Sequence, residues 1–147
     1  MLKKFIKLLI LLIIIGALVY KFFFYIDLEN GCFIKFKVSL TEFSTGNIKE
    51  SIKVLKYAEP EEYLKLCTHI NKINPNLSCA GFGGGCFYNS KPGQIDMSTA
   101  HESFVGQTAA IVVHEVCHAI QHDEGRELSE DECYNHDNEI IKNLVEH

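Results

Sequence analysis

The chain has 147 residues, of which 47% are hydrophobic and 22% charged, and its formal net charge is -5. This length suits one domain with a modest core and is too short for two domains of ordinary size. Because four of the 14 basic and one of the 19 acidic residues lie in residues 1–27, the remainder carries 10 basic and 18 acidic side chains, a net charge of -8. Such a surface repels nucleic acid, so we expect no nucleic-acid partner.

The N-terminal residues predict a membrane segment. Three lysines at the start precede Leu8 to Tyr20, a run of 13 residues without a charge, and bulky residues continue to Ile26. The 22 residues from Phe5 to Ile26 are close to the roughly 20 that span the hydrocarbon of a bilayer. We expect residues 1–27 to form a transmembrane anchor.

The sequence after this apolar run argues against cleavage. A secretory signal peptide ends in small residues, whereas the bulky KFFFYI follows here. We therefore expect a single-pass membrane protein whose N-terminus is cytoplasmic, because lysines stay on that side, and whose residues 28–147 are extracytoplasmic. The alternative is a protein secreted after signal cleavage.

All six cysteines follow the apolar segment, at positions 32, 67, 79, 86, 117 and 133. An even number of cysteines in a small exported domain predicts disulfides, but six cysteines permit 15 pairings and the sequence does not choose among them. No CxxC pair is present to suggest a zinc knuckle or a redox motif.

Short elements follow the anchor. Residues 32–43 alternate as a strand does. Residues 45–76 show apolar spacing for two helices, the second opened by Pro60 and closed by the Asn-Pro-Asn at 74–76. The glycine-rich residues 80–85 predict a loop, and residues 86–98 predict a β-hairpin.

The strongest helical pattern runs from Ala100 to His122 and is stopped by Gly125. A last helix is predicted after it, with Ser129 as N-cap and Glu132 as its capping-box partner. The whole pattern indicates a small α+β domain, with helices packed on a short sheet or hairpin.

The HEVCH sequence carries the candidate chemistry. On a helix, His114 and His118 lie one turn apart on the same face and can present two imidazole nitrogens to one metal ion. Glu115 is rotated by about 100° from His114, so it can reach a water molecule at the metal without being a ligand. A catalytic zinc also needs a third protein ligand and one open position.

Several residues could supply the third ligand. His122 lies roughly 12 Å along the helix axis from His114, too far to converge on the same ion. The metzincin pattern, with a third histidine six residues after the second, fails because Glu124 stands in that slot. Glu130 and Glu132, on the last helix, remain.

At residues 112–141 the chain resembles the gluzincin branch of the HExxH zinc metallopeptidases. HEVCH is followed by ELSEDECY, which is similar to the ExxAD and ExEAY patterns of that group. The resemblance implies a zincin-like domain, one bound Zn²⁺, and hydrolysis of a peptide or protein substrate. It places Glu130 on the ligand position, with Glu132 as the alternative, and makes Glu115 the general base.

The resemblance also gives roles to other residues. Cys133 falls on a small residue that packs against the HExxH helix, so a disulfide with Cys117 would clamp the two ligand-bearing helices. Tyr134 stands where many members have an aspartate that orients a histidine ligand. Tyr134 and His136 are candidates for stabilising an oxyanion. Asp137 either hydrogen-bonds a zinc-bound histidine or is a solvated charge.

Two other classes compete with the peptidase. One is a catalytically inactive extracytoplasmic module, either holding zinc with a fourth protein ligand such as His136 or stapled by disulfides for binding. The other is a metal-buffering protein, suggested by the seven histidines and the acidic C-terminal region. Substrate and oligomeric state are not indicated by any pattern.

Overall fold

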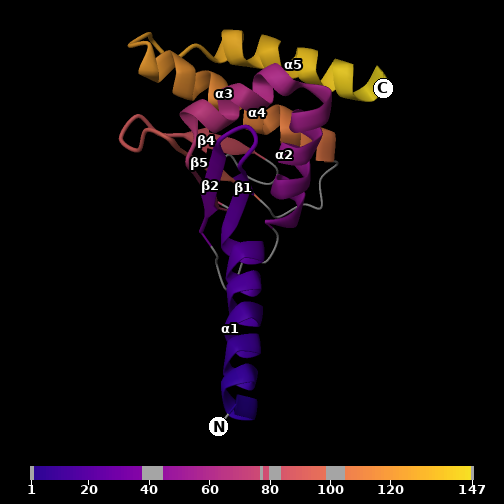
Figure 1. Ribbon diagram of the computed structural model, residues 1–147. Helices are drawn as coiled ribbons and strands as arrows, with labels where there is room; N and C mark the ends of the chain where they lie inside the picture. Colours follow the sequence, from indigo (N-terminus) through magenta and orange to yellow (C-terminus); the bar gives the residue numbers. More distant parts are fainter. Residues whose placement is uncertain (1, 38–44, 77, 80–83, 99–104, 147) are drawn as a thin grey trace.

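Five strands form one mixed sheet in the computed structural model, which describes residues 2–37, 45–76, 78–79, 84–98 and 105–146 (Figure 1). Five helices accompany the sheet in these ranges, so the architecture is α+β, as predicted. The elements in chain order are α1 (Leu2–Phe23), β1 (Phe24–Asp27), β2 (Cys32–Phe36), α2 (Gly46–Ala58), α3 (Pro60–His69), β3 (Lys72–Pro75), β4 (Gly85–Phe87), β5 (Gln94–Met97), α4 (Val105–Asp123) and α5 (Glu130–Glu146).

The strand order in the sheet is β1-β2-β3-β5-β4. The β1–β2 and β4–β5 pairs are antiparallel, whereas β2–β3 and β3–β5 are parallel. Cys86 pairs with Asp96 and Phe87 with Ile95, which confirms the predicted hairpin. Because β4 ends the strand order, it forms one edge of the sheet as far as the described residues go.

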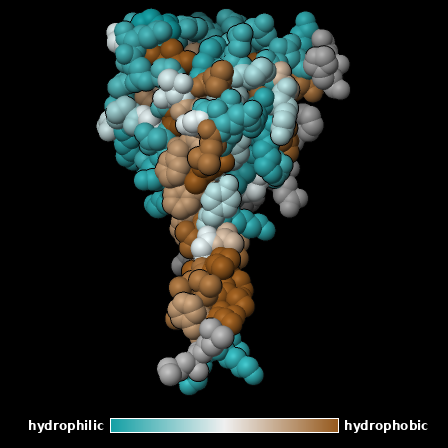
Figure 2. Space-filling view, viewed as in Figure 1, coloured by the Kyte–Doolittle hydropathy of each residue, from teal (hydrophilic) through white to brown (hydrophobic). Residues whose placement is uncertain are grey.

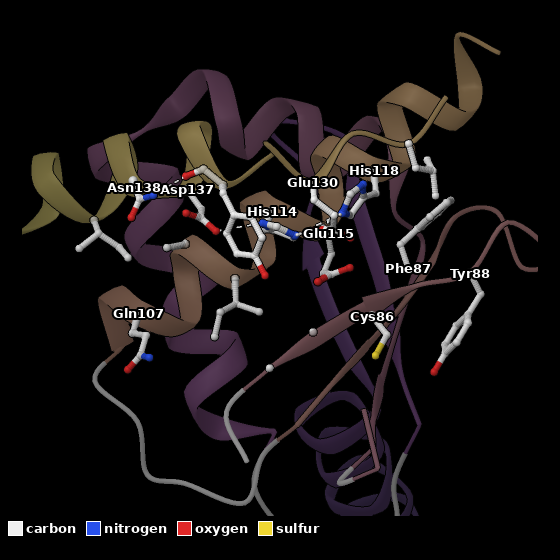
Figure 3. A pocket seen from close by; sticks show the side chains of 17 residues that line it. Cys86, Phe87, Tyr88, Gln107, His114, Glu115, His118, Glu130, Asp137 and Asn138 are labelled. Carbon is white, nitrogen blue, oxygen red and sulfur yellow. Dashed lines mark hydrogen bonds and ion pairs between the residues drawn. The ribbon is translucent and has the colours of Figure 1, made fainter. Parts of the chain in front are cut away.

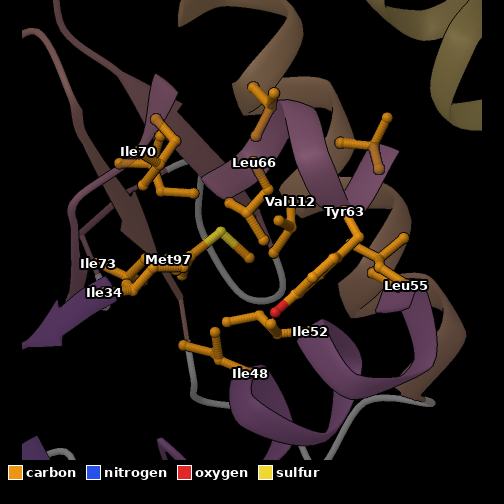
Figure 4. Packing of buried hydrophobic residues seen from close by; sticks show 14 of the residues in the cluster. Ile34, Ile48, Ile52, Leu55, Tyr63, Leu66, Ile70, Ile73, Met97 and Val112 are labelled. Carbon is orange, nitrogen blue, oxygen red and sulfur yellow. The ribbon is translucent and has the colours of Figure 1, made fainter. Parts of the chain in front are cut away.

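Helices α2, α3 and α4 enclose the core against one face of the sheet. Strand β2 alternates between buried and exposed residues, as a strand with one covered face does. Figure 4 shows how side chains from strands and helices meet there, each buried aliphatic group contributing about 1.5–3 kcal/mol. The largest fully buried aliphatic residues include Ile34, Ile48, Ile52, Leu55, Leu66, Ile70, Ile73 and Ile95.

Helix α1 projects from the domain as a stalk (Figure 1). It is long and apolar enough to cross a membrane, and a signal sequence would meet the same description. Figure 2 shows its surface as a hydrophobic column. Its side chains from Lys3 to Phe23 are exposed.

The apolar helix ends before the predicted boundary at residue 27, and residues 24–27 belong to the sheet. They form β1, which pairs along its whole length with β2. The Asp27 carboxylate lies 2.8 Å from the Lys56 ammonium and accepts a 2.6 Å hydrogen bond from the Tyr63 hydroxyl. Lys56, and then Tyr63, hold the pKa of Asp27 well below its ordinary value. The apolar helix ends at Phe23, and the folded domain begins with the next residue.

Two other predictions also need correction or completion. The Asn-Pro-Asn at 74–76 does not end a helix: α3 stops at His69, and Lys72–Pro75 form β3 between two parallel neighbours. Pairing with β2 and β5 determines this strand, and local sequence spacing does not reveal such pairing. Residues 38–43 of the predicted strand, residues 80–83 of the predicted loop and residues 100–104 of the predicted helix lie outside the described residues.

All six cysteines form disulfides: Cys32–Cys67, Cys79–Cys86 and Cys117–Cys133. The first joins β2 to α3, the second joins β4 to the segment after β3, and the third joins α4 to α5. The third is the pair that the gluzincin resemblance implied.

Candidate metal centre

Helix α4 presents both histidines and Glu115 from the middle of the domain. Its apolar residues pack into the core, and His114, Glu115 and His118 are themselves buried, with 7%, 4% and 5% of their surface exposed. The helix ends where Gly125 adopts φ +67°, a left-handed conformation that glycine takes without strain. The chain then turns towards α5.

The start of α5 brings Glu130 to the histidines. Ser129 caps this helix, as predicted, by accepting a 3.4 Å hydrogen bond from the Glu132 backbone. The Ser129 backbone N–H does not bond to the Glu132 side chain, as a capping box would require. It donates instead to Gln121 Oε1 on α4, at 3.0 Å. Gln121 therefore fixes the N-terminus of one ligand-bearing helix against the other.

His114, His118 and Glu130 form a cluster that could hold a metal ion. The two Nε2 atoms are 3.2 Å apart, and Glu130 Oε2 lies 3.2 Å from His114 Nε2 and 3.4 Å from His118 Nε2. The three atoms thus form a nearly equilateral triangle. Figure 3 shows the three side chains pointing towards one another.

The opposite ring nitrogens fix the tautomers of both histidines. His114 Nδ1 lies 2.9 Å from an Asp137 carboxylate oxygen, so it carries the proton and donates. His118 Nδ1 lies 3.2 Å from Gln121 Oε1, which also accepts from the Ser129 backbone. The Gln121 amide nitrogen donates to Glu132, so its oxygen is the acceptor and His118 Nδ1 is a donor.

These tautomers determine what the cluster can bind. With the proton on Nδ1, the neutral form of each imidazole aims an Nε2 lone pair at the centre of the triangle, where the Glu130 carboxylate also points. In that form three lone pairs at about 3 Å repel one another, and a metal ion between them would remove the repulsion. The donor set of two imidazoles and one carboxylate suits zinc.

Glu115 lies beside this triangle and faces strand β4. Burial, and then the negative charge of Glu130, raises the pKa of Glu115 to about 8, while a backbone hydrogen bond from Phe87 acts in the opposite direction. Gly85 leaves room for the carboxylate: a Cβ added there would lie 2.6 Å from Glu115 Oε1. Strand β4 therefore positions Glu115 through both its backbone and a missing side chain.

A cavity of about 700 Å³ opens above these groups between β4 and α5. His114, Glu115, His118 and Glu130 line it, and no lysine or arginine of the described residues does. Tyr134 also lines it, with its ring centroid 4.6 Å from that of His114 and 55% of its surface exposed. Its side chain is therefore open to a molecule in the cavity.

Two predicted site residues lie elsewhere. Glu132 points away from the histidines, because Arg126 pairs with it at 2.8 Å and Gln121 donates to it at 3.0 Å. Glu130 is therefore the acidic residue that joins the cluster. His136 is on another face of α5, where its Nε2 lies 2.9 Å from the Glu62 carboxylate of α3, so it reaches neither a metal in the cluster nor an oxyanion in the cavity.

The His136–Glu62 pair leads to a prediction about pH. Glu62 raises the pKa of His136, so this stabilisation is full below the ordinary histidine value near 6.5 and is lost as the pH rises through the folded-state pKa. We expect His136→Gln to lower the free energy of unfolding by about 1 kcal/mol at pH 6 and by less at pH 9. Urea denaturation at both pH values checks this, and an equal loss at both would contradict it.

Some site residues were not identified from the sequence. Gln121 lies three residues after His118, on the same face of α4, so helical spacing could have revealed it. Gly85 and Phe87 reach Glu115 only because β4 packs beside α4, and no local pattern indicates that packing. Comparison of the chain with protein-family models, with curated proteins and with solved structures found no match.

Proposed function

We propose that this protein is a zinc-dependent metallopeptidase of the gluzincin type, with His114, His118 and Glu130 as zinc ligands and Glu115 as general base. The observation that carries the proposal is the triangle of ligand atoms. Zinc binds nitrogen and oxygen at about 2.0–2.1 Å in a tetrahedron, whose edges are then about 3.3 Å. The distances of 3.2, 3.2 and 3.4 Å match these edges.

The surrounding contacts support a catalytic site over a purely structural one. Structural zinc sites use four protein ligands, whereas catalytic sites use three and leave a position for water. All three ligand residues line the cavity, so a fourth position occupied by water would open onto it. His136, a candidate for a fourth ligand, is held by Glu62 at 2.9 Å. Asp137 and Gln121 orient the two histidines, as outer partners of zinc ligands do.

In this mechanism Glu115 moves the proton. Zinc, when bound, supplies a Lewis acid for the scissile carbonyl and lowers the pKa of water at the site to about 7. Its positive charge also favours the ionised form of Glu115, whose pKa is otherwise raised to about 8. The Glu115 carboxylate accepts a proton from the attacking water and delivers it to the leaving amine. Tyr134 can donate a hydrogen bond to the substrate from the α5 side.

Strand β4 offers a place for an extended peptide. It is the edge of the sheet, so one side of its backbone can pair with an added strand. The same strand carries Gly85 and Phe87, which contact Glu115. A peptide laid along β4 would pass its scissile bond beside the general base.

Zinc stoichiometry tests the proposal. We expect the oxidised full-length chain in detergent to hold one zinc by elemental analysis, and Glu130→Ala to weaken its affinity by about 100-fold or more. Asp131→Ala is the matched control: it removes an exposed carboxylate next to Glu130, and the zinc should remain. Several weak sites would favour metal buffering, and no zinc in a folded protein would favour a disulfide-stapled binding module.

A further inference from the structure

A second cavity, of about 610 Å³, lies where α1 joins the domain. Its lining combines aromatic residues from the end of α1 and from β1 with the exposed side of α2. Lys49, Lys53 and Lys56 share one side of α2, because they are spaced by four and three residues. Lys21, in the last turn of α1, adds a fourth lysine. We call this cavity the junction groove.

The charge of the junction groove is opposite to that of the chain. Four lysines and two carboxylates, Asp27 and Glu50, line it, whereas the whole chain has a net charge of -5. Lys56 pairs with Asp27 at 2.8 Å and Lys53 with Glu50 at 2.7 Å. The other two lysines of the groove, Lys21 and Lys49, take no part in these two ion pairs.

Lys49 is held in place by neutral partners. Its ammonium donates to the backbone carbonyls of Lys21 and Phe24 and lies 4.9 Å from the centre of the Phe36 ring. Among the described residues no carboxylate pairs with it. Burial, and then the nearby Lys53, lowers its pKa, so an anion in the groove would relieve an unfavourable charge.

The position of the groove indicates which anion would reach it. Helix α1 meets the length and composition of a membrane span and ends at Phe23, so the groove would lie at the level of the headgroups. Figure 2 shows hydrophobic surface continuing from α1 onto the base of the domain. Tyr20, near the end of α1, lines the groove and is 51% exposed, and tyrosine prefers this interfacial layer.

We propose that the junction groove binds the phosphate of an anionic phospholipid, with Lys49 and Lys21 as its cationic contacts and Tyr20 beside the upper acyl chain. This inference rests on α1 lying in a bilayer and is independent of the zinc site. Each lysine near the surface should favour the anionic lipid by about fivefold.

Tryptophan fluorescence provides the test, since the chain contains no tryptophan. Full-length Tyr20→Trp is reconstituted in phosphatidylcholine vesicles that contain phosphatidylglycerol, with one of the two lipids brominated near the top of its acyl chains at the same mole fraction. We expect stronger quenching by brominated phosphatidylglycerol. Lys21→Gln and Lys49→Gln should each reduce this preference, whereas Lys142→Gln, on α5, should not.

A second reporter separates the possible failures. In Leu11→Trp the fluorophore lies inside α1, so lipids brominated deep in the chains should quench it if α1 is in the bilayer. Equal quenching of Tyr20→Trp by the two lipids, with Leu11→Trp quenched, would overturn the groove while leaving the anchor. Absence of quenching at Leu11→Trp would overturn the anchor and the groove together.

Discussion

Glu115→Gln should keep the zinc and lose peptide hydrolysis by about 10²–10⁴-fold, the usual contribution of a general base. The substitution preserves the size of the side chain, so β4 can still pack against it, but the amide cannot accept a proton from water. Cleavage of a mixed peptide library, followed by mass spectrometry beside elemental analysis for zinc, measures both effects. Retained turnover in the zinc-loaded variant would refute Glu115 as the base.

A control shows whether the loss of hydrolysis is specific to Glu115. Glu61→Gln removes a carboxylate from the exposed first turn of α3 and should leave hydrolysis unchanged.

Burial of Glu115 leads to a prediction about the stability of the metal-free protein, which should fall as the pH increases. Because the pKa of Glu115 rises from 4.5 to about 8 on folding, the parent should lose stability relative to Glu115→Gln as the pH increases between these values. If the free energy of unfolding of the parent and that of Glu115→Gln change equally with pH, Glu115 is not buried as described.

Removal of the Cys117–Cys133 disulfide should have the second large effect. It closes a loop of 16 residues, worth about 3 kcal/mol through the entropy of the unfolded chain. It also joins the two helices that carry the ligand cluster, and Cys133 Sγ lies 3.5 Å from His118 Nδ1. We expect Cys117→Ser with Cys133→Ser to lower the free energy of unfolding by this amount and to weaken zinc binding by about 10-fold or more.

Cys32→Ser with Cys67→Ser is the matched control for that experiment. This pair closes a longer loop, of 35 residues, worth about 4 kcal/mol, and lies between β2 and α3, away from the cluster. Urea denaturation should show at least as large a loss of stability, while a chelator competition should show unchanged zinc affinity in the folded protein. If both pairs weaken zinc equally, the disulfide at α4 and α5 has no special part in the site.

Helical periodicity and capping made much of this fold predictable from sequence. The apolar helix, the paired helices α2 and α3, the hairpin and the Ser129 cap follow from local patterns that the tertiary structure does not override. Strands β1 and β3 were missed, because each is only four residues long and depends on partners distant in the chain. Phe24, Tyr25 and Ile26 also continue an apolar run, and hydropathy alone assigns them to the membrane segment.

In the candidate site, too, some residues follow from local sequence spacing and others depend on tertiary packing. The spacing of His114 and His118 on one helix is visible in the sequence, but the choice between Glu130 and Glu132 depends on which way α5 faces. That orientation is set by Arg126, which pairs with Glu132, and by Gln121, which binds the cap of α5. Asp137 reaches His114 for the same reason: it lies two helical turns after Glu130 on the same side.

The direct passage from α1 into β1 has a mechanical consequence. With Phe23 ending a helix and Phe24 starting a strand, there is no tether between them, and in a bilayer the tilt of α1 would set the attitude of the whole domain. Figure 1 places α4 and α5 at the end of the domain away from the N-terminus. The cavity would thus be held at a constant height above the surface of the bilayer. A peptidase built this way would cut at a set distance from the membrane surface.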